Sequence, residues 1–224
     1  IRDFPGSDTD PFFNDTATTE IYTRVQPDYS GRATVPVLWD KQRKVIVNNE
    51  SADIVRMLNT AFNELTGSAL DLYPADLREE IDALNERLYS NLNNGVYQAG
   101  FARSQRAYEE AYEKVFAMLD ELEERLSNGR LFLFGDRLTE SDIRLFVTLV
   151  RFDLAYFGLF KCNRNLIGQM PYLSEYVARV RSLQGIEDTV NAEHIKTGYY
   201  SVKALNPQGI VPVGPDVHWQ GQNR

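Results

Sequence analysis

Two short segments combine residue types that could bind a peptide-like ligand. Val35-Pro36 opens a short apolar run, and a proline cannot donate a backbone hydrogen bond to a central β-ladder. If the Val35-Pro36 bond is cis, the adjacent strand edge could stay open. A peptide-like ligand could then pair with the Val35 backbone, as an added strand would. Glu50-Ser51 stands at a predicted helix start, where the helix N-terminus and the Ser51 hydroxyl suit a carboxylate and Glu50 suits an ammonium group. Both charges occur on a free α-amino acid. From these residues alone, an edge proline and a plain N-cap are the simpler interpretations.

The other residues with chemical potential give weaker signals. Cys162 is the only cysteine, which excludes an intrachain disulfide and fits a reducing compartment. It lies within the predicted helical region, where a thiol is more often a small packing residue than a nucleophile. The two histidines, His194 and His218, show no partner pattern for a metal ion or a catalytic triad. We therefore predict no metal site and do not assign Cys162 to catalysis.

The elements that must position these residues follow from hydrophobic periodicity. Residues 35–40 and 45–49 are short apolar runs around a charged turn, which predicts a β-hairpin, and a helix begins at about Glu50. From about residue 77 every strong signal is helical, including a Thr139-to-Asp142 capping box and a helix start near Pro171. The pattern predicts a β-β-α fragment, a linker near 66–76 and an all-α domain over 77–204. Residues 205–224 contain three prolines and three glycines and should be extended.

The overall composition excludes two classes of function. The chain has 224 residues, with 24 Lys and Arg against 32 Asp and Glu, and its formal net charge is −8. An acidic surface repels phosphate backbones, so we predict no nucleic-acid partner. No apolar run has the length of a bilayer span, and no N-terminal signal pattern is visible, so we predict no membrane partner. Together with the cysteine usage, these observations favour a cytoplasmic location.

Taken together, Val35-Pro36 and the following Glu50-Ser51 resemble the glutathione site of thioredoxin-fold transferases. Further segments narrow the resemblance to the glutathionyl-hydroquinone reductases, the xi-class, omega-like glutathione transferases. The likeness runs from about Tyr22 to Pro215. The segments that carry it are 31–32 (GR), 34–41 (TVPVLWDK), 49–52 (NESA), 93–97 (NNGVY), 99–102 (AGFA), 149–153 (LVRFD), 206–207 (NP), 209–210 (GI) and 214–215 (GP).

This resemblance implies a fold and a set of roles. The fold would be an α/β thioredoxin-like fragment, a hairpin plus helix within residues 1–65, followed by an all-α glutathione transferase C-terminal domain. Tyr97 and Tyr199 match tyrosines that face a bound hydroquinone, although a core-packing role is the simpler alternative and Tyr200 could replace Tyr199. The resemblance also implies a homodimer with glutathione as co-substrate. Glutathione would be held by Val35, Pro36, Glu50 and Ser51.

The family's reaction depends on a cysteine thiolate at the N-terminus of the first thioredoxin helix. The thiolate attacks the sulfur of a glutathionyl-hydroquinone, releases the hydroquinone, and is regenerated from the mixed disulfide by a second glutathione. The Cys-Pro-Trp-Ala type of motif that carries this thiol does not occur in the sequence. We therefore expect an N-terminally incomplete member of the family that is inactive by itself. Alternatives are another omega-like transferase or dehalogenase, and a non-catalytic binding protein with the glutathione transferase fold.

One segment departs from the family pattern. Residues 14–23 (NDTATTEIYT) are rich in threonine and lack the apolar stripe of the amphipathic helix expected there. Their sequence coincides with the translation of a widely used sequencing adapter, which favours a non-native segment. A divergent native loop is the alternative, since loops vary freely.

Overall fold

The computed structural model describes residue 30 and residues 35–217, so segment 14–23 lies outside the described residues. The chain divides into two compact units, Ile1–Tyr73 (unit 1) and Pro74–Arg224 (unit 2). The division between them falls inside the 66–76 segment.

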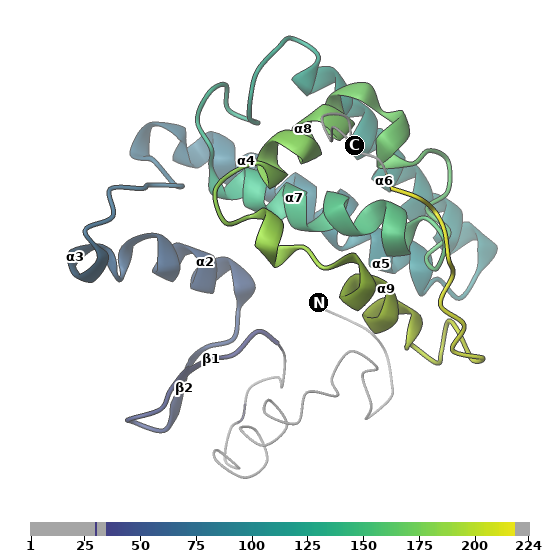
Figure 1. The fold of residues 1–224 in the computed structure, drawn as a ribbon, viewed down its shortest axis with the longest axis horizontal. Coiled ribbons are helices and arrows are strands. Elements are labelled where there is room, and N and C mark those ends of the chain that lie inside the picture. Colours follow the sequence, from purple (N-terminus) through teal and green to yellow (C-terminus); the bar gives the residue numbers. More distant parts are fainter. Residues whose placement is uncertain (1–29, 31–34, 218–224) are drawn as a thin grey trace. The chain divides into compact units, whose positions relative to one another are not determined.

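Unit 1 contains the predicted hairpin and helix (Figure 1). Strand β1 (Leu38–Asp40) pairs antiparallel with β2 (Val45–Asn48), with Leu38 opposite Asn48 and Asp40 opposite Val45. In the turn between them, the Asp40 carboxylate accepts hydrogen bonds from the backbone N–H groups of the residues two and three positions later, at 2.8 and 2.9 Å. Such an Asx-type turn replaces backbone hydrogen bonds that the chain reversal removes. The strand begins at Leu38 rather than at Val35.

Helix α2 (Ser51–Thr60) follows the hairpin directly, and a short α3 (Asn63–Thr66) ends at Gly67, whose φ of +66° suits a residue without a Cβ. None of the residues in α2 or α3 is buried. Leu58 is 56% exposed and Leu65 is 83% exposed. Within its described residues, unit 1 therefore has an amphipathic helix without a buried core.

Unit 2 is helical, as predicted from residue 77 onward. Its longer helices are α4 (Arg78–Leu88), α5 (Gly95–Gly100), α6 (Gln105–Leu126), α7 (Glu140–Arg151), α8 (Pro171–Arg181) and α9 (Ala192–Tyr200). Short helices η2 (Ala75–Leu77), η5 (Ile167–Gln169) and η6 (Glu187–Thr189) are 3-10 helices, whereas η3 (Tyr89–Asn93) and η4 (Phe152–Tyr156) are π-helices. Residues 205–217 contain neither helix nor strand.

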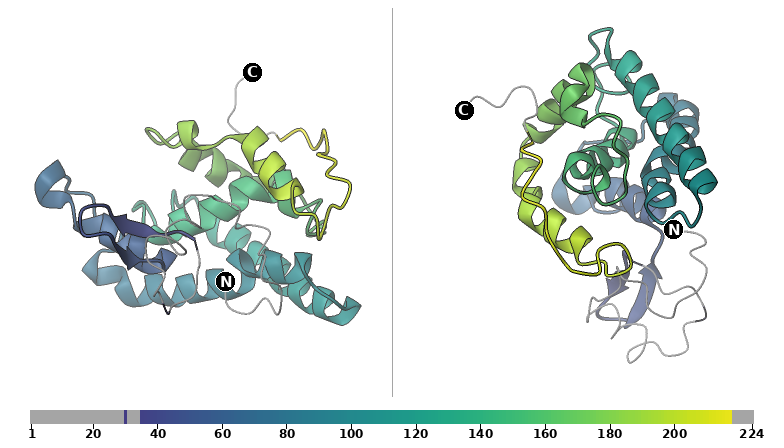
Figure 2. Two further views of the ribbon diagram at one scale, coloured as in Figure 1. Left: turned by 90° about the horizontal axis from the view of Figure 1, so that it is seen from below. Right: turned by 90° about the vertical axis from the view of Figure 1, so that its right-hand side faces the viewer.

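The core of unit 2 is built from apolar stripes with helical spacing. Helix α7 contacts both α4 and α8, α6 also packs on α8, and the right-hand view of Figure 2 shows α7 near the centre of the helices. Apolar side chains spaced three or four residues apart meet there because they share one helix face. The completely buried members include Ile81, Leu88, Val115, Leu119, Leu122, Leu145, Leu149, Leu173 and Val177.

A buried carboxylate organises the start of α7. Asp142 Oδ2 accepts hydrogen bonds from the backbone N–H (2.8 Å) and the hydroxyl (3.0 Å) of Thr139, the residue that precedes the helix. Its Oδ1 accepts from the Leu133 N–H at 2.9 Å and from the Tyr176 hydroxyl of α8 at 3.0 Å. The predicted capping box of Thr139 and Asp142 is present, and the Thr139 hydroxyl also donates to the Asp142 carboxylate. Asp142 thereby joins the α6–α7 loop to α7 and α8.

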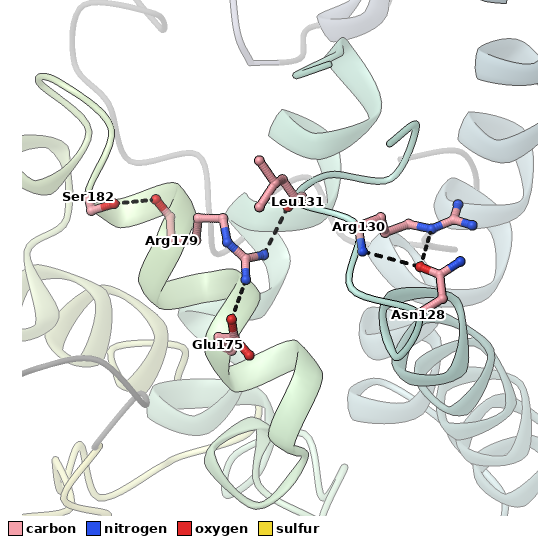
Figure 3. Close-up of polar contacts among 6 residues, drawn as sticks. All are labelled: Asn128, Arg130, Leu131, Glu175, Arg179 and Ser182. Carbon is pink, nitrogen blue, oxygen red and sulfur yellow. Dashed lines mark hydrogen bonds and ion pairs between the residues drawn. The ribbon is translucent and has the colours of Figure 1, made fainter. Parts of the chain in front are cut away.

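The loop between α6 and α7 is also held by arginines (Figure 3). Arg179 of α8 donates to the Leu131 carbonyl at 3.0 Å and forms an ion pair with Glu175 one turn earlier. The Arg130 backbone N–H and side chain both donate to Asn128 Oδ1, at 3.2 and 2.9 Å. Side chains thus form hydrogen bonds with backbone carbonyl and N–H groups of the loop, which have no regular secondary structure to pair them.

Candidate functional site

The open end of the hairpin carries both predicted glutathione segments. Because Leu38 lies opposite Asn48 in an antiparallel pair, the residues before Leu38 and those after Asn48 leave the hairpin at the same end. Val35 and Pro36 precede the ladder, their peptide bond is cis, and Val35 is 37% exposed. The short strand β1 therefore leaves the Val35 backbone outside the two-stranded ladder.

Glu50 and Ser51 form the start of α2 at this same end. Glu50 is in an extended conformation at the N-cap position, and its side chain makes no capping hydrogen bond. Its backbone N–H donates to Asn48 Oδ1 at 2.7 Å, and the Asn48 amide donates to Asp53 Oδ2 at 3.1 Å. The side chains of Glu50 and Ser51 are exposed. This geometry disfavours the plain side-chain cap and leaves a carboxylate and a hydroxyl beside free helix N–H groups.

A second group of predicted residues comes together inside unit 2. The hydroxyl oxygens of Tyr97 (α5) and Tyr199 (α9) lie 2.7 Å apart although the residues are 102 positions apart in the sequence. A third hydroxyl, that of Tyr156 at the end of η4, lies 2.8 Å from the Tyr199 oxygen. We call Tyr97, Tyr156 and Tyr199 the tyrosine cluster. Sequence reasoning named two of its members and missed Tyr156.

Aromatic side chains surround the hydroxyls of the tyrosine cluster. The Phe160 ring stacks on Tyr156 with centroids 5.2 Å apart and an interplanar angle of 18°, and it contacts the Tyr97 ring at 5.2 Å. The Tyr156 and Tyr199 rings meet edge to face at 5.2 Å. A side chain on Gly100 would overlap the Phe160 ring, so glycine permits this close approach. The result is an apolar wall with polar hydroxyls at one place, a combination suited to a phenolic ligand.

Burial raises the pKa of two hydroxyls of the cluster. It raises the pKa of the Tyr97 hydroxyl, with a further contribution from Tyr199, and the nearby Arg151 charge opposes this only in part. The pKa of Tyr156 is also raised well above its usual value, chiefly by burial, because Tyr156 is only 2% exposed. Neutral hydroxyls can donate hydrogen bonds, whereas a phenolate cannot. The hydroxyls of Tyr97 and Tyr156 can therefore act as donors at neutral pH.

Local sequence explains the placement of Tyr97 and Tyr199. The π-helix η3 ends at Asn93, whose side-chain amide donates to the Arg144 carbonyl (2.9 Å) and the Thr148 hydroxyl (2.7 Å) on α7. These bonds fix the chain next to α7 where α5 begins, four residues before Tyr97. Helix α9 starts at Asn191, which caps the His194 N–H at 2.9 Å, and α9 packs on η4. No signal in the sequence distinguished Tyr156 from an ordinary core aromatic.

The other residues considered from the sequence, Tyr200 and Cys162, lie outside the tyrosine cluster. Tyr200 is 9% exposed and its hydroxyl lies near the backbone of Gly158 and Leu159, so Tyr199 rather than Tyr200 joins Tyr97. Cys162 is completely buried, and burial raises the pKa of its thiol to about 12. Among residues 30 and 35–217, no group of three or more His, Cys, Asp or Glu side chains could hold a metal ion. No helix in that part of the chain is both long and apolar enough to cross a membrane.

Comparison with known proteins agrees with this geometry. Residues 7–61 match the N-terminal domain of glutathione S-transferases, and residues 105–179 match the C-terminal domain. The fold matches a glutathione-bound structure of YqjG, a glutathione transferase homologue from Escherichia coli, with a TM-score of 0.87 and 46% identity over 98% of this chain and 72% of that chain. A xi-class glutathione transferase from Phanerochaete chrysosporium gives a TM-score of 0.85 and 49% identity over 96% of this chain and 74% of that chain. The chain belongs to the xi-class glutathione transferases.

Curated relatives of this xi-class chain bear the names of reductases. It is 53% identical over 197 residues to the glutathionyl-hydroquinone reductase PcpF of Sphingobium chlorophenolicum, which covers 88% of this chain and 63% of the relative. Identity to the glutathionyl-hydroquinone reductase YqjG of Escherichia coli is 48% over 97% of this chain and 65% of the relative. The chain thus spans somewhat less than two thirds of the length of each of these two relatives. The family confirms the predicted thioredoxin-like fragment followed by an all-helical glutathione transferase domain.

Proposed function

We propose that this chain contributes the glutathione-binding and acceptor-binding residues of a glutathionyl-hydroquinone reductase. The observation that carries the proposal is the tyrosine cluster, in which three hydroxyls converge within an aromatic wall. The names of the PcpF and YqjG relatives support the same substrate class. We further propose a cytoplasmic homodimer, as the family resemblance suggests.

In the proposed reaction, a cysteine thiolate attacks the glutathione sulfur of the thioether and breaks its bond to the aromatic carbon. The electron pair of that bond remains on the hydroquinone ring, which takes up a proton, and the cysteine is left as a mixed disulfide with glutathione. A second glutathione thiolate then releases the enzyme thiolate and forms glutathione disulfide. Glu50, Ser51 and the Val35 backbone would hold the glutathione moiety, with Pro36 shaping the bend before the strand. Tyr97 and Tyr199 would donate hydrogen bonds to the phenolic oxygens.

The nucleophilic thiol of this reaction is not Cys162. That side chain is completely buried, and its raised pKa keeps it protonated at neutral pH. Only the thiolate is an effective nucleophile. Cys162 is also the single cysteine of the sequence, so we propose that the reactive thiol is carried outside these 224 residues.

The test is turnover of a glutathionyl-hydroquinone, followed by release of free hydroquinone. The 224-residue chain should show none, whereas the protein that also carries the thiol should turn the substrate over. In that protein, Tyr97→Phe and Tyr199→Phe should each lower turnover by roughly tenfold or more, because each removes a positioned donor but retains the ring. A matched control is Tyr108→Phe, whose hydroxyl donates to the Lys161 carbonyl at 2.7 Å and to no tyrosine of the cluster.

Two results would contradict the proposal. Turnover by the 224-residue chain that survives Cys162→Ser would show that the reaction needs no thiol from elsewhere. Parental rates in both cluster variants would show that the tyrosines only pack. An enzyme that does not turn over glutathionyl-hydroquinones but transfers glutathione to other acceptors would instead favour a different transferase activity. One Schizosaccharomyces pombe relative, 44% identical, is named glutathione S-transferase omega-like 2.

A further inference from the structure

The hydroxyl of Tyr156 is less accessible to a ligand than the other two hydroxyls of the tyrosine cluster. Tyr97 and Tyr199 are partly exposed, whereas Tyr156 is 2% exposed and lies under the Phe160 ring. Its hydroxyl interacts with the hydroxyls of Tyr199, at 2.8 Å, and of Tyr97. Every polar neighbour of the Tyr156 hydroxyl among the described residues is therefore another tyrosine of the cluster.

Burial determines where the Tyr156 proton points. A buried O–H that donates to nothing loses its hydrogen bonds to water without replacement, which is costly. Since no backbone carbonyl or carboxylate of the described chain accepts from it, Tyr156 must donate into the cluster. The Tyr199 oxygen, 2.8 Å away, is in position to accept this hydrogen bond. Tyr199 can then donate its own proton in turn.

We propose that Tyr156 is a positioning residue that orients the Tyr199 proton and strengthens it as a donor to the phenolic oxygen of the acceptor. This inference rests on the proposed function, because it concerns the same acceptor. A hydroxyl that accepts one hydrogen bond becomes a better donor in the next, and the effect is largest where water is excluded. Tyr156 itself touches neither the phenol nor the reacting sulfur. It acts through Tyr199.

The fold holds Tyr156 for this role more firmly than packing alone requires. Asp153, three residues earlier in η4, is buried and accepts from the N–H groups of Ile167 (2.6 Å) and Gly168 (3.1 Å). The Tyr156 carbonyl accepts from the Cys162 N–H at 3.1 Å. These hydrogen bonds hold the backbone of η4 in place at Asp153 and at Tyr156 itself. A fixed backbone lets the hydroxyl keep one direction.

The test is a double-mutant cycle between Tyr156→Phe and Tyr199→Phe in the thiol-bearing protein, with Tyr108→Phe as the control. Tyr156→Phe should lower kcat/KM for the glutathionyl-hydroquinone roughly three- to tenfold, the range for one net hydrogen bond. In the Tyr199→Phe background the same substitution should change kcat/KM less than about twofold. An equal effect in both backgrounds, or none in either, would overturn the proposal, because a packing role does not depend on the Tyr199 hydroxyl.

A second arm separates this inference from the proposed function. Binding of free hydroquinone to the 224-residue chain, measured by calorimetry, involves no thiol chemistry. Tyr156→Phe should weaken that binding roughly threefold or more, and only when the Tyr199 hydroxyl is present. If hydroquinone binds with this coupling but no glutathionyl-hydroquinone is turned over, the reductase proposal fails and the positioning role stands. If hydroquinone does not bind, or binds the variant equally well, the positioning role fails.

Discussion

At the scale of single residues, exposure separates the side chains that can react or bind from those that cannot. Glu50 and Ser51 are exposed at a helix start, while Cys162 is completely buried. The N–H groups at a helix start can bind the carboxylate of an amino-acid ligand, while a carboxylate side chain beside them binds the ammonium group of the same ligand. A buried thiol is inaccessible to reagents, and burial also disfavours its ionised, nucleophilic form.

Cys162 should therefore be inert in the folded chain. Because burial raises the pKa of its thiol to about 12, almost no thiolate exists at mildly alkaline pH. A disulfide-forming thiol reagent should label the native chain very slowly at that pH and label the denatured chain at once. Mass spectrometry of the labelled protein gives both rates. Equal rates would show that Cys162 is accessible.

Glu50→Ala should weaken glutathione binding by roughly tenfold or more, the range for a hydrogen bond to a charged group. The Glu50 side chain caps no helix N–H, so its removal should leave the fold intact. Calorimetric titration with glutathione on the thiol-bearing protein measures the affinity. Glu64→Ala, which removes an exposed carboxylate of α3 elsewhere in unit 1, is the control. Equal affinity in the Glu50→Ala variant and the parent would remove Glu50 from the site.

At the scale of elements, one buried carboxylate joins segments that the sequence separates. Asp142 accepts from the Leu133 N–H, from two groups of Thr139 and from the Tyr176 hydroxyl. Burial raises the pKa of Asp142, and these donors partly oppose the increase. Helix α7 also carries Thr148 and the Arg144 carbonyl, which hold Asn93 ahead of Tyr97. The capping network therefore supports the element against which the tyrosine cluster is assembled.

Asp142→Ala should lower the free energy of unfolding by roughly 3 kcal/mol or more, because it leaves several buried donors without an acceptor. Urea denaturation followed by circular dichroism measures the change. The matched control is Asp136→Ala, which removes an exposed carboxylate from the same loop and should change stability by less than about 0.5 kcal/mol. A similar, small effect of both substitutions would show that the network contributes little.

At the scale of the whole molecule, the two units differ in how they are stabilised. Helices α4, α6, α7 and α8 of unit 2 share a buried apolar core, whereas α2 and α3 of unit 1 contain no buried residue. Burial of apolar area is the dominant favourable contribution to folding. Local opening should therefore require much less free energy in unit 1 than in unit 2.

Hydrogen exchange should separate the units. Amides of α6 and α7 should exchange only through global unfolding, while those of α2 should exchange orders of magnitude faster. Mass spectrometry of peptides from a timed exchange gives both rates on one sample. Protection of α2 equal to that of α7 would show that unit 1 is stabilised as strongly as unit 2.

The sequence by itself determined the local elements and the family. Alternation and helical spacing predict the hairpin, the start of α2 at Glu50 and the apolar faces of α4 and α6, because these depend on neighbours within a few residues. Many separate segments matched the xi-class pattern, so the expected fold did not depend on any one motif. The sequence also limited thiol chemistry, since it contains a single cysteine.

Only the tertiary structure decided which tyrosines meet. Tyr97, Tyr156 and Tyr199 come from three separate helices, and nothing in the local pattern distinguishes Tyr156 from a core aromatic or Tyr199 from Tyr200. Helix α9 directs Tyr199 to the cluster and Tyr200 to the backbone near Gly158 because successive helical residues point about 100° apart. Burial, and with it the raised pKa values of Tyr97, Tyr156 and Cys162, is likewise set by packing between segments far apart in the chain.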